Sequence, residues 1–261
     1  MLKVENLSTY FYPEGKTVKA VDDVSFSVGK GEVLGILGES GSGKSTIAHS
    51  ILRLISAPGK IVSGKIIFND RDLLKLTEEQ MIKVRGAKIS MVFQDPFTSL
   101  NPVFKVGDQI AEAIQLHQGL SRKESWERAA EMLETVHIKD PHRRINDYPH
   151  QFSGGMRQRV MIAMALACQP ELLIADEPTT ALDVTIQSEI LRLIKEIQGK
   201  FNLSVVYITH NFGIIKAVCQ NVIVLYKGKV VESGGVGKVL SNPQNDYTKR
   251  LITCLEILKT G

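Results

Sequence analysis

A glycine-rich segment of eight residues constrains the fold of this chain more than any other feature. Residues 38–45 have the sequence Gly-Glu-Ser-Gly-Ser-Gly-Lys-Ser, which satisfies the pattern G-x-x-x-x-G-K-[ST], and they follow an apolar run at Val33–Leu37. A helical pattern begins at once, over Ser45–Leu54. Glycines let such a loop turn its backbone N–H groups inward around a polyphosphate, and the N-terminus of the following helix attracts anions. The sequence therefore predicts a phosphate-binding loop between a strand and a helix.

Two side chains of this loop suit the outer phosphates of a nucleotide. Lys44 supplies a positive charge to them, and the hydroxyl of Ser45 is placed to ligate Mg²⁺. On this motif alone a kinase, a GTPase and a transport ATPase are equally compatible with the sequence.

Polar residues also follow two other apolar runs, at the point where each predicted strand ends. Leu172–Ala175 leads to Asp176 and Glu177, and Val205–Thr209 leads to His210. Ligands of α/β sheets bind at the carboxyl ends of the strands. We therefore expect Asp176 to hold Mg²⁺ through water, Glu177 to polarise the water that attacks the γ-phosphate, and His210 to reach the same phosphate.

The composition is that of a soluble globular protein, because hydrophobic residues make up 43% and charged residues 23% of the 261 residues. The length suits one large domain or a core with a smaller lobe. The net charge of +4, without a run of five like charges, gives no sign of a nucleic-acid-binding surface. No stretch approaches the roughly 18 consecutive apolar residues of a membrane span. We therefore expect any work at a membrane to proceed through a partner.

The cysteines Cys168, Cys219 and Cys254 lie far apart and form no C-x-x-C pair. Their spacing suits no zinc site, and we interpret them as small apolar fillers in a reducing compartment. The histidines other than His210 show no spacing that indicates a metal site.

Strand patterns near both ends, with helices between them, predict an α/β fold. Further strands are expected at Leu2–Leu7, Val21–Val28, Lys65–Phe68, Ile89–Phe93, Ser204–Thr209 and Asn221–Tyr226. Between Asp95 and about Gln158 the pattern is helical throughout, which predicts an inserted lobe. Within it, Ser121 and Glu124 form a predicted capping box, and Trp126 is expected to pack inside the lobe. A helical tail is expected over Tyr247–Leu258.

These motifs together resemble the nucleotide-binding subunits of ABC transporters, over nearly the whole chain. Besides the phosphate loop and the switch histidine His210, Gln94 resembles the Q-loop glutamine of that family. The signature motif is matched by Phe152, Ser153, Gly154, Gly155 and Met156, and the D-loop by Ala181, Leu182 and Asp183. We know no kinase or GTPase family with this set in this order.

Longer segments are similar to the ATPases of dipeptide and oligopeptide permeases, a subfamily that includes nickel importers. They are Phe93–Pro96, Thr98–Pro102 and Tyr148–Arg159. The resemblance implies an importer at the cytoplasmic face of the plasma membrane, with two transmembrane permease subunits, a second ABC ATPase subunit in a homo- or heterodimer, and an external solute-binding protein. Peptides are the first expected solute and chelated nickel the second.

The fold implied is a P-loop NTPase of the ABC ATPase type, with a RecA-like core, an antiparallel β subdomain and an inserted helical subdomain. We expect one ABC ATP-binding domain over residues 1–261. Its α/β core covers about 1–94 and 159–240, its helical subdomain about 95–158, and its C-terminal tail 241–261. The helical subdomain is the expected surface for the membrane partner.

The resemblance also implies the residues of the site. Phe11, chosen among three aromatic residues by its spacing to Ala20, is expected to stack on the adenine of ATP. The other expected ATP-binding residues are Gly38, Glu39, Ser40, Gly41, Ser42, Gly43, Lys44, Ser45 and Thr46. The expected catalytic residues are Glu177, His210, Lys44 and Gln94, and the expected Mg²⁺ ligands are Ser45, Gln94 and Asp176.

The signature motif, placed just before a helix expected to start near Met156, would bind the γ-phosphate held by the opposite subunit. Hydrolysis then requires a dimer. Arg157 and Arg159, which follow the motif, either orient the helix or cap it with solvated charge, and we favour solvated charge.

The sequence departs from the subfamily at two points. Asn211 stands where many relatives have Asp, and only Cys254 lies beyond Cys219, where longer members carry a cysteine cluster resembling an iron–sulfur site. We therefore expect no iron–sulfur cluster. Two other functions stay open: a non-transport ABC ATPase acting in DNA repair or on ribosomes, and a subunit that binds nucleotide without hydrolysing it.

Overall fold

The computed structural model describes residues 1–95, 99–180 and 182–257. The chain divides into two compact units, of which the first comprises Met1–Met81 with Ser204–Gly261 and the second Ile82–Leu203. Pro96, Thr98 and Ala181 of the predicted motifs, and Leu258 at the end of the predicted tail, lie outside the described residues.

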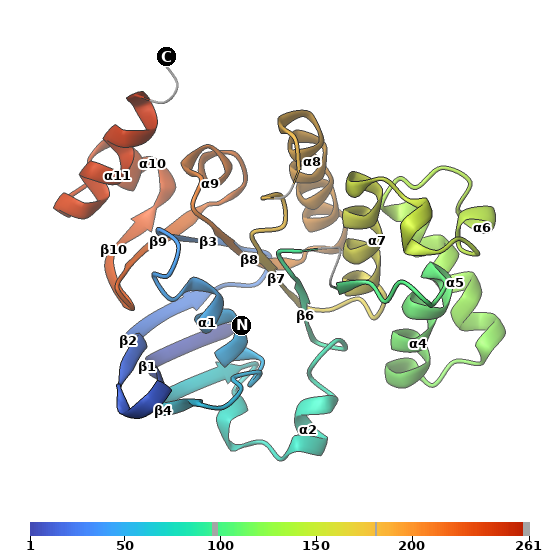
Figure 1. Cartoon of the computed structure of the whole chain (residues 1–261), viewed down its shortest axis with the longest axis horizontal. Helices are drawn as coiled ribbons and strands as arrows, with labels where there is room; N and C mark the ends of the chain where they lie inside the picture. Colours follow the sequence, from blue (N-terminus) through green and yellow to red (C-terminus); the bar gives the residue numbers. More distant parts are fainter. Residues whose placement is uncertain (96–98, 181, 258–261) are drawn as a thin grey trace. The chain divides into compact units, whose positions relative to one another are not determined.

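The first unit contains strands of two sheets (Figure 1). An antiparallel sheet has the order β2-β1-β4-β5 and is built from β1 (Leu2–Phe11), β2 (Val18–Val28), β4 (Gly59–Phe68) and β5 (Arg71–Asp72). A second set has the order β10-β9-β3-β8 and is built from β3 (Val33–Leu37), β8 (Ser204–Thr209), β9 (Asn221–Tyr226) and β10 (Lys229–Gly235). Here β3 runs parallel to both β8 and β9, and β10 returns antiparallel to β9.

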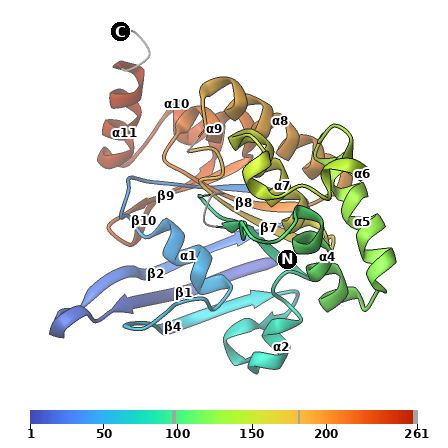
Figure 2. The same cartoon turned by 45° about the vertical axis from the view of Figure 1, so that its right-hand side comes forward.

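Short helices accompany these strands. They are α1 (Lys44–Ile51), α2 (Glu78–Ile82), α9 (Phe212–Val218), α10 (Val236–Ser241) and α11 (Asp246–Ile257), with 3₁₀ turns η1 (Pro13–Gly15) and η2 (Leu73–Lys75). In Figures 1 and 2, α1 lies against the part of the antiparallel sheet formed by β1 and β2.

The central strand β3 is anchored by burial along its whole length. All five of its residues are buried, and Leu37 belongs to an apolar cluster with residues of α9, β9, α10 and α11. Gly35 lets α9 approach the strand closely, because a Cβ there would lie 2.5 Å from Cδ1 of Ile215. Burying a large aliphatic side chain contributes about 1.5–3 kcal/mol. The carboxyl end of β3 is therefore a fixed starting point for the loop that follows.

The second unit combines a parallel strand pair with a cluster of helices. Its strands are β6 (Ile89–Val92) and β7 (Leu172–Asp176), and its helices are α4 (Val106–Gln118), α5 (Arg122–Thr135), α6 (Pro141–Arg144), α7 (Gly154–Leu166) and α8 (Val184–Phe201), with the 3₁₀ turn η3 (Pro149–Gln151). Figures 1 and 2 both show α4, α5, α6 and α7 gathered together. The buried residues of α4 and α5 recur at helical spacing and face this cluster.

Every predicted strand is present, and the described residues between Asp95 and Gln158 contain only helices and turns. The prediction missed β5, which has only two residues, and β10, whose sequence Lys-Val-Val-Glu-Ser-Gly-Gly shows no apolar alternation. Helix α7 begins at Gly154, two residues before the predicted start near Met156, because Ser153 caps the helix and both glycines take helical positions. The predicted helix over Ser45–Leu54 is α1, which is shorter at its C-terminus.

The predicted capping box of α5 is confirmed. The Ser121 hydroxyl accepts from the Glu124 N–H at 3.3 Å, and the Glu124 carboxylate accepts from the Ser121 N–H at 2.9 Å. These two bonds satisfy N–H groups that a helix start leaves without partners.

We expect Ser121→Ala to lower the free energy of unfolding by about 1 kcal/mol, because the side-chain acceptor of the cap is lost. Ser121→Thr keeps a hydroxyl and is the matched control. Urea unfolding measures both variants, and equal stabilities for Ala and Thr would contradict the capping role.

Candidate functional site

The first unit brings the phosphate loop and His210 to one edge of its parallel strands. Leu37, the last residue of β3, is paired with Thr209, the last residue of β8. Gly38 and His210 follow directly, so the loop and the histidine leave the sheet side by side. The His210 side chain is exposed, and Asn211 caps α9 by accepting from the Gly213 N–H at 2.8 Å. Asn thus performs here the capping that Asp would also perform.

The phosphate loop is held by close backbone packing that only glycine permits. Gly43 has φ +106°, and a Cβ on it would lie 2.1 Å from the carbonyl oxygen of Ala20. A Cβ on Gly38 would lie 2.4 Å from the carbonyl oxygen of Leu225. The carbonyl oxygen of Ser42 accepts from the Gly228 N–H at 2.9 Å. The loop is therefore seated on the start of β2 and on the β9–β10 turn.

Lys44 points back into the loop that precedes it. Its side chain is buried, and Nζ donates to the carbonyl oxygens of Gly38 and Glu39, each at 2.8 Å. An ammonium group buried in this way needs such oxygen partners, because desolvation of a charge is costly. The positive charge is thus fixed at the centre of the loop.

The loop also contains a buried polar atom that fits a ligand. Ser42 is 5% exposed, and its Oγ has no hydrogen-bond partner among the described residues. Leaving such a group unsatisfied costs about 1–3 kcal/mol. Gly43 at the N-cap of α1 offers no side-chain acceptor to the helix start, where Ser45 is exposed and Thr46 half-buried. These features fit a phosphate, whose oxygens accept from a hydroxyl and from backbone N–H groups.

The three aromatic residues near the end of β1 have different surroundings. The Tyr10 hydroxyl donates to Asp22 at 2.7 Å. Phe11 is half-buried beside β4, because a Cβ on Gly59 would lie 2.6 Å from its Cε1. Tyr12 is exposed. Tyr10 is therefore held to β2 by its hydroxyl, which leaves Phe11 and Tyr12 as the candidate rings for stacking.

The second unit gathers Gln94, Asp176 and Glu177 at one edge of its strand pair. Val92 of β6 is paired with Ala175 of β7, so the residues that follow both strands emerge at the same end. Asp176 is buried and Glu177 half-buried. The backbone of Glu177 has φ +46°, a left-handed conformation that is uncommon for a residue with a side chain. Strain of this kind concentrates at functional sites.

Two side chains orient the carboxylate of Glu177. Its Oε2 accepts from Thr180 Oγ1 at 2.9 Å and from Gln94 Nε2 at 3.4 Å. Sequence reasoning missed Thr180, although its place three residues after Glu177 in a turn was an available signal. The described structure contains no group of three or more His, Cys, Asp or Glu side chains that could hold a metal ion.

The predicted signature and D-loop residues lie beside each other within the second unit. Phe152 is buried, and Ser153 caps α7 by accepting from the Met156 N–H at 3.4 Å. A Cβ on Gly155 would lie 2.6 Å from Cγ2 of Ile186, so the first turns of α7 and α8 pack closely. Asp183 caps α8 by accepting from the Ile186 N–H at 2.9 Å.

Leu182 lies on the same side of α7, because a Cβ on Gly154 would be 3.8 Å from its Cδ2. The third D-loop residue, Ala181, is outside the described residues.

The interpretation of Arg157 and Arg159 as solvated charges was wrong. Arg157 Nε donates to the carbonyl oxygen of Phe152 at 3.0 Å. The side chain of Arg159 is 14% exposed and donates to the Val136 carbonyl oxygen at 3.0 Å and to the Glu189 carboxylate at 2.9 Å. Both arginines therefore orient α7, and Arg159 ties it to α5 and α8.

Cys219 behaves as the predicted apolar filler. Its Sγ lies 3.1 Å from the position of a Cβ on Gly35, and burial raises the pKa of the thiol to about 12. Burial also raises the pKa of Cys168, whose Sγ lies 3.4 Å from the Ala113 carbonyl oxygen. Neither thiol is therefore activated as a nucleophile or metal ligand.

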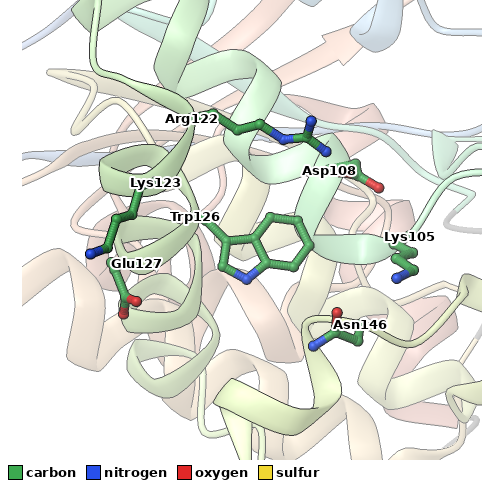
Figure 3. Close-up of a pocket in the computed structure, with 7 residues that line it drawn as sticks. All are labelled: Lys105, Asp108, Arg122, Lys123, Trp126, Glu127 and Asn146. Atoms are coloured by element: carbon green, nitrogen blue, oxygen red, sulfur yellow. The ribbon is translucent and has the colours of Figure 1, made fainter.

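A hollow of about 540 Å³ lies on the second unit around Trp126 (Figure 3). Its lining combines three cationic side chains, two carboxylates, an amide and the indole: Lys105, Arg122, Lys123, Asp108, Glu127, Asn146 and Trp126. Figure 3 shows the indole between Lys123 and Glu127 on one side and Lys105 and Asn146 on the other, with Arg122 above it. A Cβ on Gly107 would lie 2.7 Å from the indole Cη2. Trp126 therefore packs against α4, as expected, and also forms part of an accessible surface.

Comparison with known proteins identifies the family. The family model described as "ABC transporter" matches residues 21–180. The chain belongs to the ABC transporter family. It is 53% identical over its whole length to the probable peptide ABC transporter ATP-binding protein y4tR of Sinorhizobium fredii, of which it covers 78%. It is 49% identical over 98% of its length to the dipeptide transport ATP-binding protein DppD of Escherichia coli K12, of which it covers 78%.

Solved ABC cassettes share the fold. The dimeric cassette MJ0796 bound to ADP and phosphate superimposes with a TM-score of 0.80 at 30% identity, covering 90% of this chain and 99% of that one. The cbiO1 protein of Clostridium perfringens, part of the ABC transporter complex cbiONQ, superimposes with a TM-score of 0.78 at 29% identity over 98% of both chains. The predicted P-loop NTPase fold of the ABC ATPase type is confirmed, and the chain is an ATP-binding and ATP-hydrolysing member of the family.

The packing of the ABC phosphate loop predicts unequal effects for two glycine substitutions. Gly41→Ala meets no atom within 4 Å but must keep φ +77°, which costs about 1–2 kcal/mol. Gly43→Ala carries a similar conformational cost and also clashes with the Ala20 carbonyl oxygen. We expect the fall in Tm for Gly43→Ala to be clearly the larger, as measured by differential scanning fluorimetry. Equal Tm values would contradict the described seating of the loop.

Proposed function

We propose that this chain hydrolyses ATP to energise the import of dipeptides or oligopeptides through a membrane permease. The named relatives at about half identity over nearly the whole chain support peptides as the solute, and they favour peptides over chelated nickel. The observation that carries the hydrolytic part is the oriented carboxylate of Glu177, which accepts from Gln94 and Thr180 at the end of β7.

Some of the site residues bind ATP and stabilise the negative charge of its phosphates, and Glu177 activates the attacking water. The phosphate loop, residues 38–45, and Thr46 bind the phosphates of ATP, and Phe11 stacks on the adenine. Lys44 and His210 stabilise negative charge at the γ-phosphate, and Glu177 polarises the attacking water. The carboxylate of Glu177 suits this role because Thr180 and Gln94 hold it in a fixed orientation at the end of β7.

Ser45, Gln94 and Asp176 are the residues of this chain that would hold Mg²⁺. Each presents an oxygen atom, the ligand type that this ion prefers. When bound, the ion neutralises negative charge on the phosphate oxygens. The exposed hydroxyl of Ser45, at the start of α1, supports its part in this set.

The signature residues Phe152 to Met156 act on the ATP of a second ABC subunit. Ser153 and the two glycines start α7, so a hydroxyl, bare backbone N–H groups and the positive end of a helix dipole meet an anion there. The D-loop residues Ala181, Leu182 and Asp183 belong to the same contact region. The dimeric state of the MJ0796 cassette supports this arrangement. A homodimer and a heterodimer with a related ATPase both satisfy it.

The helical lobe of about residues 95–158 is the surface for the two permease subunits. In this proposal the α/β core covers about residues 1–94 and 159–240, and the C-terminal tail covers 241–261. Its Trp126 hollow offers an indole and three cationic side chains to an acidic, partly apolar segment of a permease. Val103 and Phe104, next to Lys105, add exposed apolar surface of the kind that marks protein contacts. None of the described helices combines the length and apolarity needed to cross a bilayer. Because the named relatives are subunits of peptide transport systems, we infer that the chain works from the cytoplasmic face as a peripheral subunit and that a solute-binding protein outside delivers the peptide.

We expect Glu177→Gln to reduce ATP turnover by about 100-fold or more while ATP binding persists, because the amide no longer accepts a proton or polarises water as a carboxylate does. Glu171→Gln is the matched control: it removes a carboxylate just before the same strand, where Glu171 pairs with Lys88 at 3.0 Å. Phosphate release and equilibrium ATP binding are the two measurements. Turnover that survives in Glu177→Gln would remove Glu177 from the mechanism.

We expect the tagged chain, purified from its native membrane, to retain two multi-span proteins and a second ABC ATPase. Lys105→Glu combined with Arg122→Glu should lose the multi-span proteins, because both substitutions reverse charge in the Trp126 hollow. Lys139→Glu, an exposed position of the same unit, is the control and should retain them. Mass spectrometry identifies the retained proteins, and recovery of ribosomal or DNA-repair proteins instead would contradict the transport function.

A further inference from the structure

The C-terminal segment of the chain returns to the start of the phosphate loop. Tyr247, the second residue of α11, is 8% exposed, and its hydroxyl accepts from the Glu39 N–H at 3.4 Å. Its ring packs on that of Tyr226 at the end of β9, with centroids 4.1 Å apart. Burial raises the pKa of the Tyr247 hydroxyl, so the group stays neutral and accepts through an oxygen lone pair.

The peptide group contacted by Tyr247 is the one that also holds Lys44. The carbonyl oxygen of Gly38 and the N–H of Glu39 belong to a single planar peptide unit. Lys44 Nζ donates to the carbonyl oxygen at 2.8 Å, and the N–H donates to Tyr247. The Gly38–Glu39 peptide unit therefore connects the Tyr247 hydroxyl to the Lys44 ammonium group. Rotation of this peptide unit would break both hydrogen bonds.

Tyr247 is itself fixed in place by contacts within the first unit. It belongs to the apolar cluster that contains Leu37, the last residue before the loop, and Phe212 of α9. The Tyr247 N–H donates to Asn245 Oδ1 at 2.9 Å, and the Asn245 N–H donates to the Glu232 carboxylate at 3.1 Å. The phenol is thus carried on a segment held to β10, which gives it the rigidity that a positioning group needs.

We propose that Tyr247 is a positioning residue of the ATP site, which orients the Gly38–Glu39 peptide and, through it, the ammonium group of Lys44. Ring packing alone does not require the hydroxyl, since phenylalanine would fill the same space. The hydroxyl supplies the acceptor that the Glu39 N–H needs from outside the loop. Helix α11 therefore contributes to nucleotide affinity, although it lies far from the phosphate loop in sequence. This inference rests on the phosphate loop being the ATP site.

The test is Tyr247→Phe in the full chain, which removes one hydroxyl and keeps the ring. We expect the Kd and the KM for Mg·ATP to rise about three- to tenfold, the effect of one lost hydrogen bond, with kcat at saturating ATP within about twofold of the parent value. Tyr226→Phe removes the hydroxyl of the neighbouring ring and should leave Kd and KM unchanged. Equilibrium titration with ATP and steady-state phosphate release measure these quantities.

A wild-type Kd for Tyr247→Phe would overturn the positioning role. A fall in Tm and in kcat without a change in Kd would also overturn it, because that pattern indicates a purely structural ring. If the parent chain fails to bind ATP in the same titration, the ATP site itself is overturned, so the two failures are distinguishable.

Discussion

The buried ammonium of Lys44 is the constraint on which the phosphate loop depends. A charge in this position must be surrounded by oxygen atoms, and the carbonyl groups of Gly38 and Glu39 supply them at 2.8 Å. Those carbonyl groups can face inward only because the loop starts from a strand that is buried along its whole length and contains glycine where side chains would clash. The packing of β3 against β8, β9 and α9 therefore serves an electrostatic purpose, since it holds a positive charge in place before any phosphate arrives. Preorganisation of this kind avoids reorganisation at the moment of reaction.

In the second unit, the corresponding constraint is the orientation of the Glu177 carboxylate. Glu177 follows the buried strand β7 and takes a left-handed backbone conformation, with φ +46°. Such a conformation costs about 1–2 kcal/mol in a residue with a side chain, and it persists only where the surroundings hold it. Here the parallel pairing with β6 fixes the strand end, and Thr180 and Gln94 fix one carboxylate oxygen. The strain therefore coincides with the position proposed to activate water.

Local patterns explain why the sequence predicted much of this molecule. The phosphate loop, the buried strands β3, β8 and β9 and the α5 capping box all follow from short spacings, and the structure contains them within a few residues of their predicted limits. The features that were missed depend on contacts between distant segments. Arg159 looked solvated because its partners are Val136 and Glu189, which no local pattern connects to it. Tyr247 gave no signal for the same reason, since 208 positions separate it from Glu39. The roles of the site residues depend on bound ATP, and they remain predictions.

The helix starts of the chain differ in whether a side chain caps them, and α1 shares the lack of such a cap with α4, α6 and α10. Side chains cap α5, α8 and α9, where Ser121, Asp183 and Asn211 accept from the first turn. At α1 the cap position is Gly43, which offers no acceptor and no negative charge. An Asp there would satisfy one N–H group but would repel a phosphate, while a glycine leaves the positive end of the helix dipole to the anion. Ser153 caps α7 by accepting from the Met156 N–H at 3.4 Å, and its hydroxyl keeps a proton to donate. A hydroxyl donor at the positive end of a helix dipole is what the proposed role of the signature serine in a dimer requires.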